Sequence, residues 1–98
     1  MKNYMVDIRL PDVLSEEFLA TIPRQRATVN KLMEERIILS YSLAMDRSKL
    51  WTVIRAESES DVFDVLSELP LIGWMRFDIY ELAFNETAFR KMGYMSLN

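Results

Sequence analysis

The apolar residues of this chain follow two different spacings, and the order in which these spacings alternate constrains the fold more than any single motif. Residues 3–10 alternate apolar and polar side chains, as in a half-buried strand, and Pro11 ends the run. Apolar residues then recur at helical spacing as far as residue 36. Two strand-like runs, a second helical run and a last strand at residues 76–84 complete the order.

The first helical run begins with a capping signal. Ser15 precedes two glutamates, and acidic residues are favourable near the positive end of a helix dipole. Pro23 lies inside the run, so we expect it either to kink the helix or to start its main part after a cap at Thr21.

The middle of the chain is typical of a hairpin followed by a helix. Strand-like runs at residues 37–45 and 49–56 are separated by a short polar turn, which predicts an antiparallel pair. Ser58 or Ser60 is then placed to cap a second helix with an apolar face.

This order predicts an α+β ferredoxin-like fold, in which a four-stranded antiparallel sheet carries both helices on one face. We expect one domain over residues 1–84 and a C-terminal tail, residues 85–98, at a subunit contact. The uncovered sheet face would then mix apolar and charged side chains. These are Met5, Trp51, Val53, Tyr80 and Leu82 beside Asp7, Arg9, Arg55, Arg76 and Asp78. Packing against the same face of a second copy would bury them, which predicts a dimeric α/β barrel.

The composition excludes several kinds of site. The chain has no cysteine and no histidine, which removes thiolate chemistry, the commonest general base and the usual metal ligands, so we expect no metal and no cofactor. A net charge of −3 argues against a nucleic-acid partner. The sequence shows neither a long apolar run nor a signal peptide, so we expect no membrane partner and a cytoplasmic location.

Two motifs carry a resemblance to a known family. VDIRLP at residues 6–11 and LPLIGWM at residues 69–75 stand on either side of a long helix and a hairpin. With them, the chain resembles the muconolactone delta-isomerase family of dimeric α/β barrels over roughly residues 1–84. In this family the second motif is structural, and Pro70 and Gly73 within it are expected to end the second helix.

The resemblance also implies assembly and activity. Enzymes of this family form rings built from dimers and isomerise a small unsaturated lactone acid by moving a proton. Their histidines, which follow the first helix and the last strand, have no counterpart in residues 37–43 or 82–85 of this chain.

Two carboxylates are the candidate catalytic groups. Asp78 and, with less support, Asp7 lie among apolar residues of the uncovered face, where a carboxylate can act as a base toward a carbon-bound proton. The alternative is a structural network of ion pairs, in which Asp78 meets Arg9 or Arg55.

Arginines and aromatic residues of the same face are the candidate ligand-binding groups. Arg9, Arg55 and Arg76 each carry a guanidinium that can bind a carboxylate with two hydrogen bonds. Trp51 and Tyr80 share this face by strand parity and are placed to line a pocket for a planar ligand.

Other residues receive more ordinary interpretations. The pattern leaves the orientation of Tyr41 open, and Phe77 and Ile79 are expected to lie buried under the helices. The basic residues of the first helix are expected to form a solvated face; they are Arg24, Arg26 and Lys31.

Taken together, these features predict a homodimer, or a ring of dimers, that binds a small anionic organic molecule. As an enzyme it would be a metal-free isomerase or lyase that works by proton transfer. The alternative is a non-catalytic ligand-binding or assembly module with a filled inter-sheet core. An open pocket around Asp78 favours the enzyme, whereas charges paired with one another favour the module.

Overall fold

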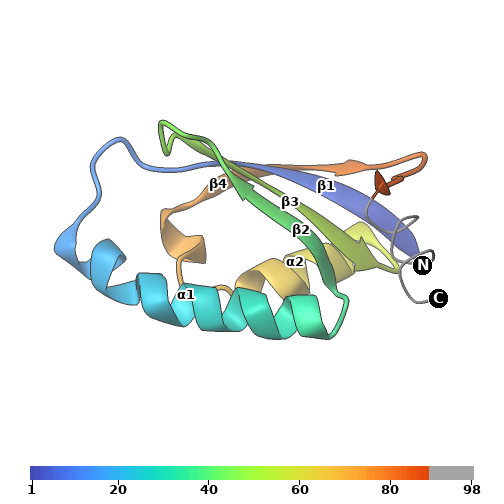
Figure 1. Cartoon of the computed structure of the whole chain (residues 1–98), viewed down its shortest axis with the longest axis horizontal. Coiled ribbons are helices and arrows are strands. Elements are labelled where there is room, and N and C mark those ends of the chain that lie inside the picture. The colour runs from blue at the N-terminus through green and yellow to red at the C-terminus, as the bar shows by residue number, and fades with distance from the viewer. Residues whose placement is uncertain (89–98) are drawn as a thin grey trace.

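The structure, a computed structural model, describes residues 1–88 of the 98-residue chain. The elements are β1 Lys2–Arg9, α1 Glu16–Glu34, β2 Ile38–Leu43, β3 Lys49–Ala56, α2 Glu59–Ser67, the 3₁₀-helix η1 Ile72–Trp74 and β4 Arg76–Glu81 (Figure 1). The predicted ferredoxin-like α+β fold is confirmed. The tail expected at residues 85–98 lies mostly outside the described residues.

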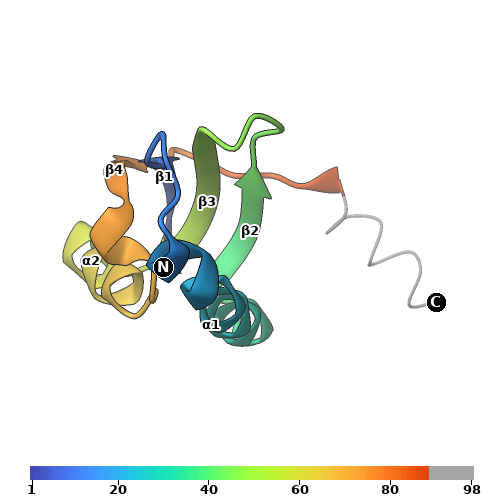
Figure 2. The same ribbon diagram turned by 90° about the vertical axis from the view of Figure 1, so that its left-hand side faces the viewer.

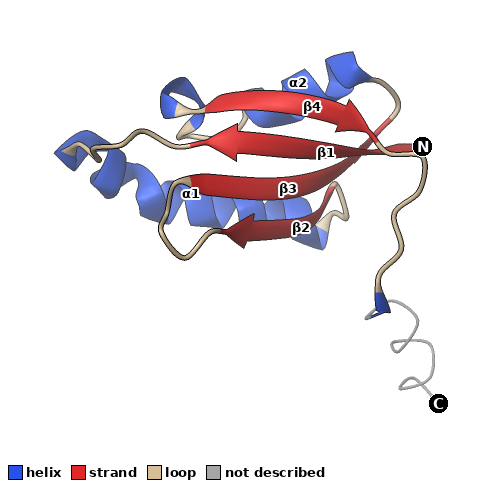
Figure 3. Ribbon diagram, turned by 90° about the horizontal axis from the view of Figure 1, so that it is seen from above, coloured by secondary structure: helices blue, strands red, loops and turns tan. Residues whose placement is uncertain are grey.

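The four strands form one antiparallel sheet in the order β2-β3-β1-β4. Both helices lie on the same side of this sheet, which arches over them (Figures 1 and 2). Seen from the opposite side, the strands lie in front of both helices (Figure 3). We call that uncovered side the open face. By register and alternation it carries Asn3, Met5, Asp7, Arg9, Ser40, Ser42, Lys49, Trp51, Val53, Arg55, Arg76, Asp78 and Tyr80.

The core lies between the sheet and the helices. In β1, Tyr4, Val6 and Ile8 are at most 2% exposed, as their alternation predicts. Their β3 partners Ile54 and Leu50 are buried with them, and both helices contribute their apolar stripes. Each fully buried aliphatic side chain of this kind stabilises the fold by about 1.5–3 kcal/mol.

The parity of β4 agrees with the prediction. Phe77 pairs with Ile8 and Ile79 pairs with Val6, so both point to the helix side, while Asp78 pairs with Asp7 on the open face. Phe77 and Ile79 are only partly buried, because β4 is an edge strand.

Both helices begin at serine caps. The Ser15 hydroxyl accepts a hydrogen bond from the Phe18 N–H at 3.1 Å, and the Ser58 hydroxyl accepts one from the Asp61 N–H at 3.3 Å. Helix α1 runs through Pro23 as a single element, so the alternative start at Thr21 is wrong.

Strand β2 contains a β-bulge that decides the direction of a side chain. Ile38 pairs with Ile54 and Tyr41 pairs with Thr52, so three residues of β2 advance against two of β3. The extra residue turns Tyr41 to the helix side of the sheet. The carbonyl of Ser40 at the bulge accepts a hydrogen bond from the Thr52 hydroxyl at 2.8 Å.

The segment between α2 and β4 differs in part from the expectation. Helix α2 ends at Ser67 with its cap at Glu68, two residues before Pro70, which is where a proline that cannot continue a helix is expected. Gly73 lies too far along the chain to end the helix. Leu69 and Leu71 are buried in the core, at 2% and 4% exposure, and hold the connection in place. Strand β4 ends at Glu81, three residues earlier than expected, and the chain then leaves the sheet on the β2 side (Figure 3).

Candidate functional site

Three rows of side chains cross the open face, one apolar, one acidic and one cationic. In the strand order β3, β1, β4 they are Val53, Met5 and Tyr80; Trp51, Asp7 and Asp78; and Lys49, Arg9 and Arg76. Neighbouring rows are two residues apart along each strand, so side chains of the acidic and cationic rows meet on diagonals.

Each aspartate of the acidic row is paired with a cation of the next row. Lys49 Nζ lies 3.2 Å from Asp7 Oδ2, and Arg9 Nη2 lies 3.5 Å from Asp78 Oδ2. The sequence left the partner of Asp78 open between Arg9 and Arg55, and the structure has Arg9. Both side chains of this pair are about half exposed, at 51% and 54%, so the pair contributes about 1 kcal/mol or less.

Asp7 is less well satisfied than Asp78. Its Oδ1 atom is shielded from solvent and has no hydrogen-bond partner among residues 1–88. Asp78 lies directly opposite it on β4, and like charges at such positions repel one another. The cationic row offsets this repulsion.

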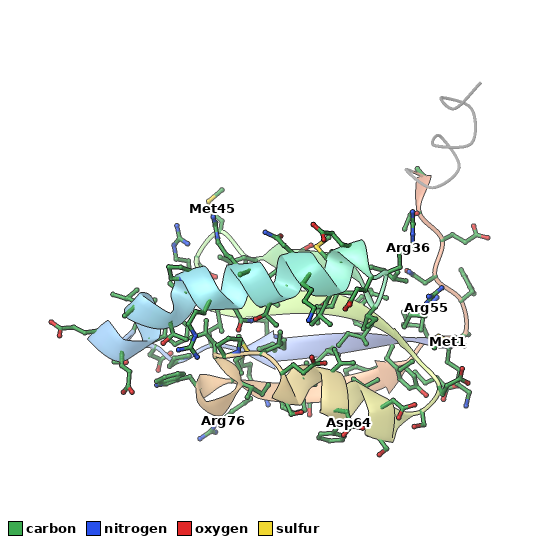
Figure 4. All side chains as sticks on the ribbon, turned by 90° about the horizontal axis from the view of Figure 1, so that it is seen from below. Met1, Arg36, Met45, Arg55, Asp64 and Arg76 are labelled. Atoms are coloured by element: carbon green, nitrogen blue, oxygen red, sulfur yellow. The ribbon has the colours of Figure 1, made fainter. Side chains whose placement is uncertain are left out.

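Arg55 does not belong to this cluster. It pairs with Asn3 near the far end of the sheet, six residues along β3 from Lys49, or roughly 20 Å. In Figure 4 Arg55 and Arg76 lie far apart from one another along the sheet. A single pocket shared by Arg9, Arg55 and Asp78 is therefore not formed within one chain.

The aromatic candidates are on the open face, as parity predicts. Trp51 is 37% exposed and Tyr80 is 55% exposed, and they lie in neighbouring rows. In the single chain these rings are surface features beside the paired charges.

A cavity of about 460 Å³ lies on the other side of the sheet, between α1, β2 and the β2–β3 hairpin. Apolar residues form most of its wall, among them Leu14, Phe18, Ile22 and Leu50. The polar residues that line it are Gln25, Arg26, Asn30, Tyr41 and Arg47. Its volume falls within the range common for small-molecule sites.

The two arginines reach this cavity from different elements. Arg26 comes from α1, and Arg47 comes from the hairpin turn, where its backbone is left-handed with φ 63°. Asp46 stabilises the turn by accepting hydrogen bonds from the N–H and the hydroxyl of Ser48, at 3.0 and 2.7 Å. Neither arginine forms an ion pair within the described residues, and their cavity wall contains no aspartate or glutamate there.

Gln25 is the most buried polar residue of the cavity wall, at 3% exposure. Its Nε2 donates a hydrogen bond to the Tyr41 hydroxyl at 3.0 Å, and its Oε1 accepts one from the Leu71 N–H at 3.0 Å. The side chain thus connects α1, β2 and the LPLIGWM segment, and this bridge fixes one side of the cavity.

Tyr41 is the group of the cavity wall with a shifted proton affinity. Burial raises the pKa of its phenol above the usual range, and the hydrogen bond from Gln25 lowers it by less. The phenol therefore stays neutral near pH 7 and keeps its proton, so it can donate a hydrogen bond but makes a poor base.

Residues 3–86 match the muconolactone delta-isomerase family in a comparison with known protein families. The chain belongs to this family. Apart from Lys2 at the start of β1, the match covers the strands and helices described above, including the leucine-rich segment after α2. A comparison with curated proteins gave no match.

In this member of the muconolactone delta-isomerase family, several polar side chains line the cavity on the helix side of the sheet, where the sequence predicted no site. Arg26 is exposed, as expected of a solvated face, but it also borders the cavity, as does the exposed Arg47, for which the sequence predicted no role. One signal was available: Gln25 interrupts the apolar stripe of α1 between Ile22 and Val29, and a buried polar residue needs partners. The direction of Tyr41 was not readable, because a bulge sets it.

Two further findings concern metal sites and helices that could span a membrane. Among residues 1–88, no group of three or more acidic side chains is arranged to hold a metal ion. Within the same residues, no helix has both the length and the apolar character needed to cross a bilayer.

Proposed function

We infer that this protein binds a small organic anion in the cavity beside α1. The observation that carries this proposal is the pair of guanidinium groups, Arg26 and Arg47, which line one cavity without a carboxylate in its described wall. Two cations with no internal counter-charge favour a negatively charged ligand group, and a guanidinium holds a carboxylate with two hydrogen bonds.

The remaining wall defines the rest of the ligand. Most of the lining side chains are aliphatic or aromatic, so the body of the ligand is apolar and its burial supplies much of the affinity. A compact carboxylic acid with a ring or a short branched chain fits this description. The site differs from the one expected from sequence, which lay on the open face.

Replacing Arg26 and Arg47 together with glutamine should weaken binding of cyclohexanecarboxylate by at least about tenfold. Hydrogen bonds to charged groups contribute about 1.5–3 kcal/mol each, and glutamine keeps much of the length without the charge. Isothermal titration calorimetry measures the change. Arg24→Gln, on α1 but outside the cavity wall, is the matched control and should bind as the wild type does.

The neutral amide of the same acid provides the second comparison. It should bind the wild type more weakly than the acid and should be insensitive to the two arginine substitutions. Equal affinity for acid and amide, or an equal loss with Arg24→Gln, would refute the anion site.

Self-association through the open face is the second part of the proposal. Helices cover one side of the sheet (Figure 2). The other side exposes Trp51 and Tyr80, beside the partly buried Met5 and the already buried Val53. A second copy on this face would bury Trp51 and Tyr80 and enclose the charged rows. Within such an interface Asp7 and Asp78 are the carboxylates available for proton-transfer isomerisation. Their ion pairs with Lys49 and Arg9 must open first.

Tyr80→Glu should convert a dimer into a folded monomer in sedimentation velocity at micromolar concentration. A charge introduced at the centre of an apolar contact has no partner there. Leu19→Glu is the control, because Leu19 on α1 is 50% exposed, close to the 55% of Tyr80, but on the helix layer. A wild type that sediments as a stable monomer contradicts the dimer and removes the enclosed setting for Asp7 and Asp78.

A further inference from the structure

The amide of Gln25 has a determined orientation. The Leu71 N–H lies 3.0 Å from one end of it, and the Tyr41 hydroxyl lies 3.0 Å from the other. A backbone N–H can only donate, so the end that faces Leu71 must be the oxygen, Oε1. The nitrogen, Nε2, therefore faces Tyr41.

This orientation sets the role of the Tyr41 hydroxyl. An amide nitrogen carries two protons and offers no lone pair, so the hydroxyl oxygen must accept the bond from Gln25. A phenol has one proton and two acceptor positions. Its proton is thus not used toward Gln25 and is left for a second partner.

The surroundings of Tyr41 leave the cavity as the place for that partner. The β2 bulge turns its side chain to the helix side of the sheet, where it lines the cavity together with Arg26 and Arg47. Gln25 itself is almost fully buried and joined at both ends, so rotation of its amide would bring two donors together at Leu71.

We propose that Gln25 is a positioning residue that makes Tyr41 a one-directional hydrogen-bond donor to the ligand of this cavity. The site then selects an anion that carries a second oxygen acceptor, such as a carbonyl, at a distance from its carboxylate. This inference rests on the proposed function and adds a specificity that the two arginines do not supply.

A matched pair of probes tests the donor. 4-Oxocyclohexane-1-carboxylate and 4-methylenecyclohexane-1-carboxylate have nearly the same shape, but only the first has a carbonyl acceptor. Calorimetry on the wild type should show about two- to tenfold tighter binding of the ketone, as one neutral hydrogen bond provides. Tyr41→Phe should remove this preference while the methylene compound binds unchanged.

Gln25→Glu tests the positioning role through a pH profile. When the introduced carboxyl is ionised it accepts from both Leu71 and Tyr41, so the phenol proton turns away from the cavity. When it is protonated it can donate to Tyr41 as the amide does. The ketone preference of the variant should therefore decline as the pH rises through the pKa of the introduced carboxyl, while that of the wild type stays flat over the same range. Burial raises this pKa, and the hydrogen bonds from Leu71 and Tyr41 to the ionised form lower it.

The possible results of these experiments distinguish the roles of Tyr41 and Gln25 from the anion site on which they rest. Equal binding of both probes to the wild type overturns the donor role and leaves the anion site intact. A ketone preference in Gln25→Glu that does not change with pH overturns the positioning role. Failure of both probes to bind the wild type refutes the anion site and, with it, the role of Tyr41.

Discussion

Phe18→Ala should lower the free energy of unfolding by about 3–4 kcal/mol, the lower part of the range for buried phenylalanine. Phe18 is 4% exposed and packs its ring edge against Trp74 of the LPLIGWM segment, with centroids 5.7 Å apart. The substitution removes this contact together with the transfer free energy of the ring. The cost stays below the top of the range because Phe18 already borders the cavity.

Thermal unfolding followed by circular dichroism measures this effect. A loss of this size should reduce the melting temperature by at least about 12 °C in a domain of this length. Leu19→Ala is the matched control: it is the next residue of α1, it is 50% exposed, and it should change stability by about 0.5 kcal/mol or less. A similar loss in both variants would mean that α1 docks on another face.

The fold was readable from sequence because its strands and helices differ in period. Alternation in β1 identified Tyr4, Val6 and Ile8 as core, and the same parity carried through β4 to Asp78. Ser15 indicated the start of the first helix, and Ser58 or Ser60 that of the second, of which the structure has Ser58. Caps are readable from sequence because the serine accepts a bond from the third residue after it, which is a local interaction.

The cavity was not readable, because it depends on features without periodicity. Two consecutive residues of β2 share one register step, and this single insertion decides on which side Tyr41 lies. The position of Arg47 at the cavity depends on its own left-handed backbone in the hairpin turn, and the position of Arg26 depends on which side of α1 faces β2. The alternation of apolar and polar residues predicts neither position, because both depend on tertiary structure.

For the charged residues of the open face, the sequence predicted the side of the sheet but not the contacts between them. Strand parity placed Arg9, Arg55 and Asp78 on one side correctly, but parity gives no position along the strand. The register puts Arg55 beside Asn3 and Asp78 beside Asp7, so of these two arginines Arg9 is the one that pairs with the acidic row. Which side a residue faces was predictable, whereas which residues meet was not.

Leu69→Ala should cost about 2–5 kcal/mol of unfolding free energy, whereas Gly73→Ala should be neutral or stabilising by about 0.4–1 kcal/mol. Leu69 is 2% exposed in the core, and removal of its branched side chain leaves a void there. A Cβ added at Gly73 would meet nothing within 4 Å, and the backbone there is not left-handed. Alanine also restricts the unfolded chain more than glycine does.

Urea unfolding of the two variants distinguishes two explanations of the LPLIGWM motif. If the motif works as a helix stop, its proline and glycine should be the sensitive positions. We expect Leu69 to be more sensitive than Gly73, because Gly73 lies well past the end of α2 at Ser67, whereas Leu69 and Leu71 are buried and secure the connection to β4. A larger loss for Gly73→Ala than for Leu69→Ala would reverse this order. It would mean that the segment needs backbone freedom at Gly73 more than it needs burial at Leu69.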